Sequence, residues 1–145
     1  MEETREFIDE AGRIGIVKYG LIQVIKIRTN CFYTAKKLAD MGFIEEIFKK
    51  ECPCCRKEEE EDIIHIIKDC EYWKEQRKNS FGGALGVNSI KLLACHKLLG
   101  GKLQRWMGET PTVGNVTEEV IFSTLLNIIS FLNRIMQKRK KILFP

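Results

Sequence analysis

Four residues in the middle of the chain have the types and spacing of a metal site. Cys52, Cys55, His65 and Cys70 follow the pattern C-x2-C-x9-H-x4-C. A Cys-x2-Cys turn places two thiolates on one ion, and a downstream His and Cys complete a tetrahedron. Three thiolates and one imidazole fill every position and leave none for a reactive water. The pattern therefore predicts one structural Zn²⁺ and no catalytic metal.

The remaining cysteines give no second site. Cys54 lies inside the x2 turn and should point away from the metal, while Cys31 and Cys95 have no partner nearby and are expected in the core. Cys95 and His96 are adjacent on a predicted helix and therefore do not face each other as a nucleophile and its base would. We expect no catalytic residue and no enzyme. The alternative for the four predicted ligands is that they are core residues of a cysteine-rich chain.

Charge is segregated along the chain. Residues 11–39, 76–108 and 120–145 contain no acid and carry +6, +6 and +5, whereas residues 40–75 carry −6. Clustered Lys and Arg gain affinity for polyanions by releasing counterions from phosphates, although charged residues also simply solvate surfaces. The residues predicted to contact nucleic acid are Lys18, Lys26, Arg28, Lys36, Lys37, Arg77, Lys78, Lys102, Arg105, Arg134, Lys138, Arg139, Lys140 and Lys141.

The acidic residues are concentrated between the predicted ligands, where Glu58, Glu59, Glu60, Glu61 and Asp62 form a run. Because such a run repels phosphate, we expect it to face solvent or a basic protein. Five aromatic residues provide possible stacking surfaces for unpaired bases, although core packing is the more ordinary use of each. They are Phe32, Tyr33, Tyr72, Trp73 and Trp106.

Length and composition bound the class of protein. The chain has 145 residues, 44% hydrophobic and 30% charged, which is typical of a soluble globular domain and too short for a polymerase or a kinase. No apolar run reaches the roughly 20 residues that cross a bilayer. The acidic start has no apolar signal region, so the six cysteines are expected to be reduced and the protein intracellular.

The elements that would position these residues are helical. Apolar spacing predicts helices over 17–27, 35–41, from 62 onward, over 72–81 and over 89–99, and a last helix that includes 121–136, with Gly42, Gly82 and Gly100 as stops. The last is the clearest, because Ile121, Leu125, Ile128, Leu132 and Ile135 repeat on one face, widened by Phe122, Leu126, Ile129 and Met136. Asn115 is the expected N-cap of this helix.

These elements predict a mostly α fold. We expect a small helical domain around one CCHC zinc site, with a long amphipathic C-terminal helix and a basic tail. Three segments are distinguished: residues 1–30 hold an acidic N-terminus and a first basic helix, 31–84 the zinc module, and 85–145 the C-terminal helices with the tail.

Residues 27–80 resemble a known module. Arg28-Thr29, Gly42, Cys52-Pro53, Cys55, the acidic run, His65, Cys70 and Arg77 occupy places that match the zinc-binding domain after the polymerase in non-LTR retrotransposon reverse transcriptases. The final apolar helix with Phe131 and Arg134 is more loosely similar, and the four-residue gap between His65 and Cys70 departs from the family spacing. The resemblance implies a domain that holds template RNA or target DNA. The chain lacks the polymerase motif Tyr-x-Asp-Asp.

Together these features favour a non-enzymatic, zinc-containing RNA-binding protein. We expect it to dock on structured RNA, foremost ribosomal RNA with ribosomal proteins in the cytoplasm, and to block a functional site there. One alternative is the nucleic-acid-binding end of a retrotransposon reverse transcriptase, with DNA as a possible partner and residues 137–141 as a nuclear localisation signal. The other is a protein-interaction adaptor. No membrane and no small-molecule substrate are expected.

Overall fold

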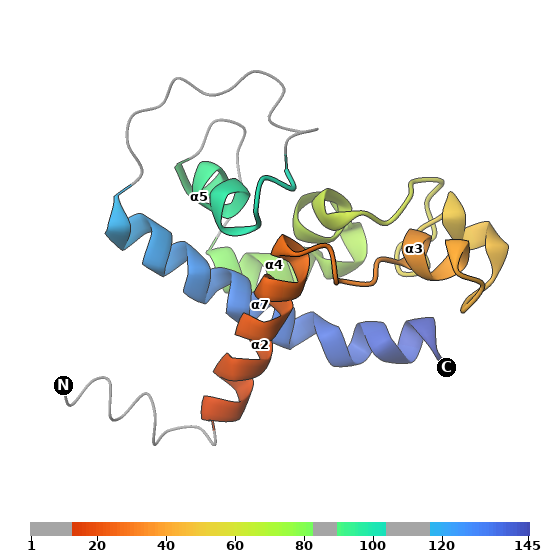
Figure 1. The fold of residues 1–145 in the computed structure, drawn as a ribbon, viewed down its shortest axis with the longest axis horizontal. Helices are drawn as coiled ribbons and strands as arrows, with labels where there is room; N and C mark the ends of the chain where they lie inside the picture. The colour runs from red at the N-terminus through yellow and green to blue at the C-terminus, as the bar shows by residue number, and fades with distance from the viewer. Residues whose placement is uncertain (1–12, 83–89, 104–116) are drawn as a thin grey trace.

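The computed structural model describes residues 13–82, 90–103 and 117–145, which are mostly helical and contain no strand. Its α-helices are α2 (Arg13–Arg28), α3 (Ala35–Asp40), α4 (Lys74–Phe81), α5 (Ile90–Leu98) and α7 (Glu118–Leu143). Three short turns lie between them: the 3₁₀ turns η1 (Glu46–Lys49) and η3 (Glu71–Trp73), and the π-helical turn η2 (His65–Asp69). The prediction of a mostly α fold with a long C-terminal helix is confirmed (Figure 1).

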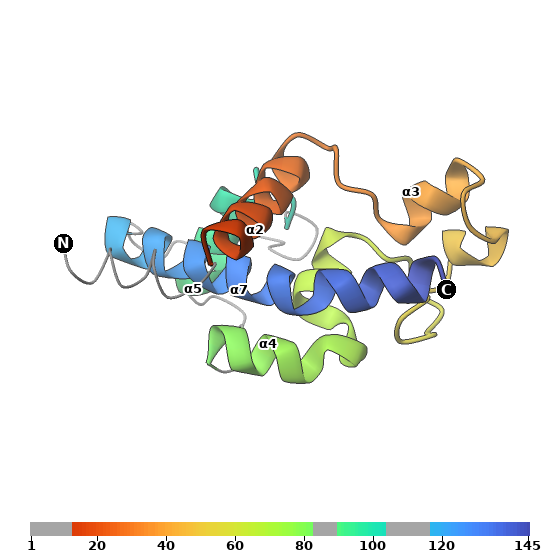
Figure 2. The ribbon, with the colours of Figure 1, turned by 90° about the horizontal axis from the view of Figure 1, so that it is seen from below.

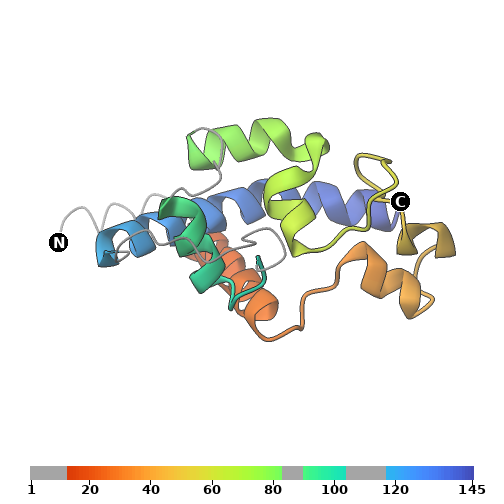
Figure 3. The same cartoon turned by 90° about the horizontal axis from the view of Figure 1, so that it is seen from above.

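Helix α7 is the centre of the fold. Helices α2, α4 and α5 all pack against it, and α2 and α4 lie on opposite sides of it (Figures 2 and 3). Its predicted apolar stripe forms the contact, since Ile128, Leu132 and Ile135 are fully buried. Phe122 was expected to widen this stripe but is 63% exposed, whereas Thr124, two residues further along α7, is fully buried.

The ends of α7 are built as helix physics requires. The side chain of Thr117 accepts a hydrogen bond from the N–H of Val120 and caps the helix. The cap was predicted at Asn115, which lies outside the described residues. Acidic residues occupy the first turn and basic residues the last, as the helix dipole favours.

Length and composition alone make α7 a candidate membrane span, since one 18-residue window has a mean hydropathy of 1.3. The absence of a continuous apolar run of about 20 residues did not predict a helix of this mean hydropathy. A third of that window is buried inside the fold, so the apolar residues that raise its hydropathy include those that α2, α4 and α5 cover.

Helix α2 crosses α7 at unusually close range. A Cβ atom added to Gly20 would lie 2.6 Å from a methyl group of Ile129 and 3.1 Å from its carbonyl oxygen. The missing side chain of Gly20 therefore permits the crossing. Helix α2 is continuous through this glycine, from Arg13 to Arg28.

One buried core joins the three segments expected from the sequence. It includes Ile27 from α2, Trp73 from η3, Leu99 after α5 and Phe131 from α7. A second, smaller cluster of Ala35, Leu38 and Leu143 holds α3 beside the C-terminal turn of α7. The segments that carry the predicted metal ligands contribute Cys52 and Cys70 to the larger core.

Candidate metal centre and the basic side chains around it

The turn that carries two of the predicted ligands is wider than an α-helix. It begins where the Asp62 carboxylate accepts a hydrogen bond from the N–H of His65, at 2.8 Å. It ends where the N–H of Cys70 donates to the carbonyl of His65, at 2.6 Å. Residues five apart in an α-helix point about 140° away from each other, and the i→i+5 bond of a π turn reduces this separation. The x4 spacing therefore still directs His65 and Cys70 to one point.

The four predicted ligands converge. The Sγ atoms of Cys52 and Cys70 are 3.9 Å apart, Cys55 Sγ is 3.4 Å from His65 Nε2, and all four ligand atoms lie within 4.8 Å of one another. Ligand atoms around one tetrahedral ion, each about 2.0–2.3 Å from it, lie about 3.5–3.8 Å apart. The cluster could therefore hold a metal ion.

A fifth residue orients the histidine. Nε2 of His65 faces the cysteines, and Nδ1 lies 3.2 Å from the Glu59 carboxylate. The imidazole is 3% exposed, whereas the Glu59 side chain is 59% exposed. A carboxylate on the outer nitrogen fixes the tautomer that presents the inner nitrogen to a metal. The sequence does not single out this role, because Glu59 is one of five consecutive acids and nothing distinguishes it from the other four.

Cys54 was expected to point away from the metal, but its thiol lies close to that of Cys52, one of the four predicted ligands. Its buried thiol forms a second close group with Cys52 and Glu61, and its Sγ lies 4.0 Å from a Glu61 oxygen. Hydrogen bonds from the thiols of Cys54 and Cys70 hold the pKa of Cys52 far below its ordinary value. The same bonds, with burial, raise the pKa values of Cys54 and Cys70. Negative charge is therefore favoured on Cys52, which belongs to both groups.

Glu61 does not face solvent with the rest of the acidic run. Its side chain is fully buried, accepts a hydrogen bond from the Ala35 N–H at 2.7 Å, and forms an ion pair with Arg139. Arg139 also donates to the Tyr33 carbonyl at 2.9 Å. A buried carboxylate persists only when it is paired and hydrogen-bonded, and Arg139 supplies that partner.

Two arginines predicted to contact nucleic acid are instead used inside the protein. Arg139 is 4% exposed, so its charge is committed to Glu61. Arg77 donates to the carbonyls of Ile67 at 2.7 Å, Cys70 at 3.0 Å and Ile66 at 3.2 Å. The carbonyls of Ile66 and Ile67 belong to the π turn, and that of Cys70, just after it, also accepts a hydrogen bond from the N–H of Trp73 at 3.2 Å. Burial lowers the pKa of Arg77 from its usual range. Both arginines therefore hold the metal-ligand loops in place.

Six further predicted contacts are at least partly exposed but have partners within the protein. Arg28 donates to the carbonyls of Lys97 and Leu98 and so caps α5. Lys36 pairs with Asp40, and Lys37 and Lys102 contact the carbonyl and the side chain of Asn30. Arg134 donates to Ser130, and the ammonium group of Lys138 lies over the ring of Tyr72. Such surface contacts are weak and can be exchanged for phosphate contacts.

Five predicted lysines are exposed and have no ion pair or side-chain hydrogen bond within the described part of the chain: Lys18, Lys26, Lys78, Lys140 and Lys141. Lys26 and Lys140 line one groove between α2 and the end of α7. Arg105 and Trp106 lie outside the described residues. Two of the five exposed lysines therefore lie beside one groove, on the first and last described helices.

Comparison of the chain with protein-family models, curated proteins and solved structures finds no match.

Proposed function

We propose that the protein is a non-enzymatic RNA-binding protein whose fold is held by one structural Zn²⁺. The observation that carries the proposal is the division of charge. Exposed lysines with no acidic partner among the described residues occupy α2 and the end of α7, while the run of five acids at 58–62 lies between the candidate metal ligands. RNA phosphates are the polyanion that such lysines would bind through counterion release.

Zinc is the metal that suits the cluster. Soft thiolates with one imidazole in a tetrahedral arrangement favour Zn²⁺ over Mg²⁺, Ca²⁺ or Mn²⁺, which prefer oxygen ligands. Cys52 and Cys70 are fully buried and His65 is nearly so, which leaves little access for a substrate. The four ligands also leave no open position for water, so we assign the ion a structural role.

The RNA we propose is ribosomal RNA, in a cytoplasmic particle. Ribosomal RNA is the most abundant structured RNA of a cell, and a small protein with apolar helices and exposed lysines could occupy a functional centre of the ribosome and silence it. The test is sucrose-gradient sedimentation of the native protein from its own cells, with and without ribonuclease. Co-migration with ribosomal particles that ribonuclease abolishes is expected. Migration as a free or DNA-bound species contradicts the ribosomal partner.

RNA binding itself is tested with purified, zinc-loaded protein. We expect affinity for a hairpin RNA to fall steeply with salt, and the double variant Lys140→Ala/Lys141→Ala to flatten that dependence by about 1–2 in the slope of log K against log salt. The matched control is Lys49→Ala, whose ammonium group pairs with Glu46 at 3.1 Å on η1. Binding that is indifferent to salt and nuclease would exclude phosphate contacts and favour an adaptor of other proteins.

A further inference from the structure

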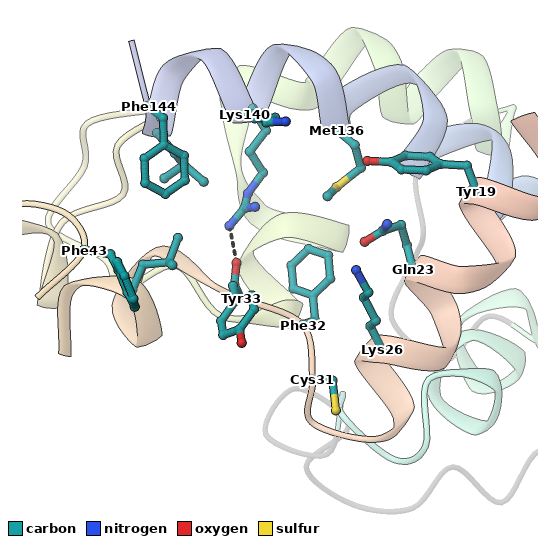
Figure 4. Close-up of a pocket in the computed structure, with 13 residues that line it drawn as sticks. Tyr19, Gln23, Lys26, Cys31, Phe32, Tyr33, Phe43, Met136, Lys140 and Phe144 are labelled. Carbon is teal, nitrogen blue, oxygen red and sulfur yellow. Dashed lines mark hydrogen bonds between the residues drawn. The ribbon is translucent and has the colours of Figure 1, made fainter. Parts of the chain in front are cut away.

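We propose that the groove between α2, α3 and the end of α7 binds the unpaired nucleotides of an RNA strand. This inference rests on the proposed RNA binding and assigns it a site. The groove has a volume of about 490 Å³, within the range of roughly 300–1,000 Å³ typical of ligand sites. Its walls come from α2, the linker after it, the residues around α3, and the last two turns of α7 (Figure 4).

Aromatic rings surround the groove and are unusually exposed. Tyr19, Tyr33, Phe43 and Phe144 line it and are 43%, 56%, 66% and 51% exposed. Phe43 and Phe144 lie at one end, and Tyr19 lies with Gln23 at the other (Figure 4). Single exposed apolar residues are ordinary, but a contiguous group around a hollow indicates a binding surface.

The groove is held open by the buried ion pair behind it. Arg139 fixes the backbone of the linker through the Tyr33 carbonyl, and its guanidinium lies 5.2 Å from the centre of the Phe32 ring. Because Glu61 in turn binds Arg139 and the first N–H of α3, the two walls of the groove are fixed relative to each other. Rings that are already in place lose less entropy when a ligand binds.

Among the described residues, the free charge that lines the groove is positive. Lys26 and Lys140 line it, none of the described lining residues is acidic, and the charge of Arg139 is neutralised by Glu61. Two cations beside exposed rings match the chemistry of a single strand, whose phosphates and base faces alternate along the chain. A fatty chain would use the rings but needs only one cation, and an acidic peptide would use the lysines but not four rings.

An unpaired strand fits better than a duplex. In a double helix the base faces are covered by their neighbours, so aromatic side chains reach them only where bases are splayed out. Tyr19 and Tyr33, which line the groove and are exposed, carry hydroxyls that can donate to and accept from base edges. Loops and ends of a structured RNA are therefore the parts expected to enter the groove.

The test compares two RNAs and matched variants of the full zinc-loaded chain. Fluorescence anisotropy would measure the affinity for a labelled ten-nucleotide oligouridine and for a hairpin closed by a tight tetraloop. The variants are Tyr33→Ala/Phe43→Ala in the groove, and Phe122→Ala as a control, since Phe122 is an equally exposed ring on the outer part of α7. Lys140→Ala is paired with Lys141→Ala, which removes the same charge one residue outside the lining.

We expect the groove variants to weaken oligouridine binding by about 5-fold or more, the loss of one stacked base, while hairpin binding changes by less than about 2-fold. Phe122→Ala should bind both RNAs as the unaltered protein does. Lys140→Ala should weaken oligouridine binding more than Lys141→Ala. Zinc content and thermal melting of each variant must match the parent, which the exposure of these rings allows.

The outcomes separate the two proposals. If the unaltered chain binds RNA and the groove variants bind oligouridine equally well, the groove assignment is overturned and RNA binding stands. If the groove variants lose hairpin and oligouridine binding equally, the groove is not selective for unpaired bases and the inference again fails. If the unaltered chain binds neither RNA, the proposed function itself is wrong.

Discussion

Glu59 and Glu61 are two residues apart on one loop and have different surroundings. Glu59 is exposed to solvent and orients His65 from outside the cluster, whereas Glu61 is fully buried against Arg139. Their difference arises from where the loop folds: one side chain meets the imidazole and the other meets the backbone of α3. The chemistry of each carboxylate is therefore set by its neighbours rather than by its place in an acidic run.

Replacing Glu59 tests the orienting role. The variant Glu59→Gln should lower the affinity for Zn²⁺ by about 10- to 100-fold, as loss of such outer partners does in metal sites. The measurement is competition with a chromogenic chelator at fixed pH. Glu60→Gln is the control, because Glu60 is the adjacent exposed acid and belongs to neither metal group. Equal affinities for the two variants would show that the carboxylate does not act through His65.

Breaking the Glu61–Arg139 pair should be costly. Arg139→Met leaves a buried carboxylate without its cation and should lower the free energy of unfolding by about 3–5 kcal/mol. The double variant Glu61→Gln/Arg139→Met should recover part of this loss, since the amide oxygen can still accept from Ala35. Chemical denaturation of the two single variants and the double variant gives the coupling energy.

The exposed pair Lys36–Asp40 is the control for that cycle. Lys36→Met should cost less than about 1 kcal/mol. Additive effects of the Glu61 and Arg139 replacements would show that the two side chains do not stabilise each other.

At the scale of elements, the close crossing of α2 and α7 depends on one missing side chain. The variant Gly20→Val should lower the free energy of unfolding by about 1–3 kcal/mol, because its methyl groups would overlap Ile129 and its backbone. Thermal melting of the zinc-loaded protein measures the effect. Lys18→Val, at an exposed position of the same helix, should cost no more than a few tenths of a kcal/mol. If both variants lost a similar free energy of unfolding, α2 and α7 would not approach each other as closely as Gly20 and Ile129 indicate.

The local sequence predicts the helices and the candidate metal ligands. It does not predict which residues the arginines contact. Glycines with φ of +71° and +68° end α4 and α5 at Gly82 and Gly100, as predicted, because left-handed stops are a property of the residue itself. The four ligands were likewise evident from spacing. Arg77 and Arg139 look like any surface cation in the sequence, since their partners are carbonyls and a carboxylate that lie 7 to 106 residues away along the chain. Only tertiary contacts identify them.

At the scale of the whole molecule, the metal cluster and the helical core are continuous. Cys52 and Cys70 belong to the same buried core as Ile128 and Leu132 of α7. Structural zinc contributes about 10–16 kcal/mol in small modules, and a domain's net stability is about 5–15 kcal/mol. The proposed Zn²⁺ would therefore contribute about as much free energy as the net stability of the whole fold, and its loss is expected to unfold the chain. The groove walls depend on the same loop through Glu61.

Metal removal tests this dependence. Chelation, or the variant Cys70→Ser, should unfold at least residues 43–80 and release the groove, with loss of helical circular dichroism and of amide-exchange protection. Cys31→Ser is the control, because Cys31 is exposed and belongs neither to the four candidate ligands nor to the close group of Cys52, Cys54 and Glu61. Retained melting temperature after complete metal removal would contradict a structural role for the ion.

The position of α7 as the central helix also has a consequence for biosynthesis. All four ligands precede residue 71, whereas α7 begins at Glu118 and Arg139 comes later still. At about 5–20 residues per second, a growing chain presents its complete ligand set several seconds before the helix that covers it. During that interval the proposed Zn²⁺ would hold the two ligand loops together while Glu61 still lacks its cation. The order of synthesis would thus make the metal an early crosslink in the nascent chain, formed before α7 packs over it.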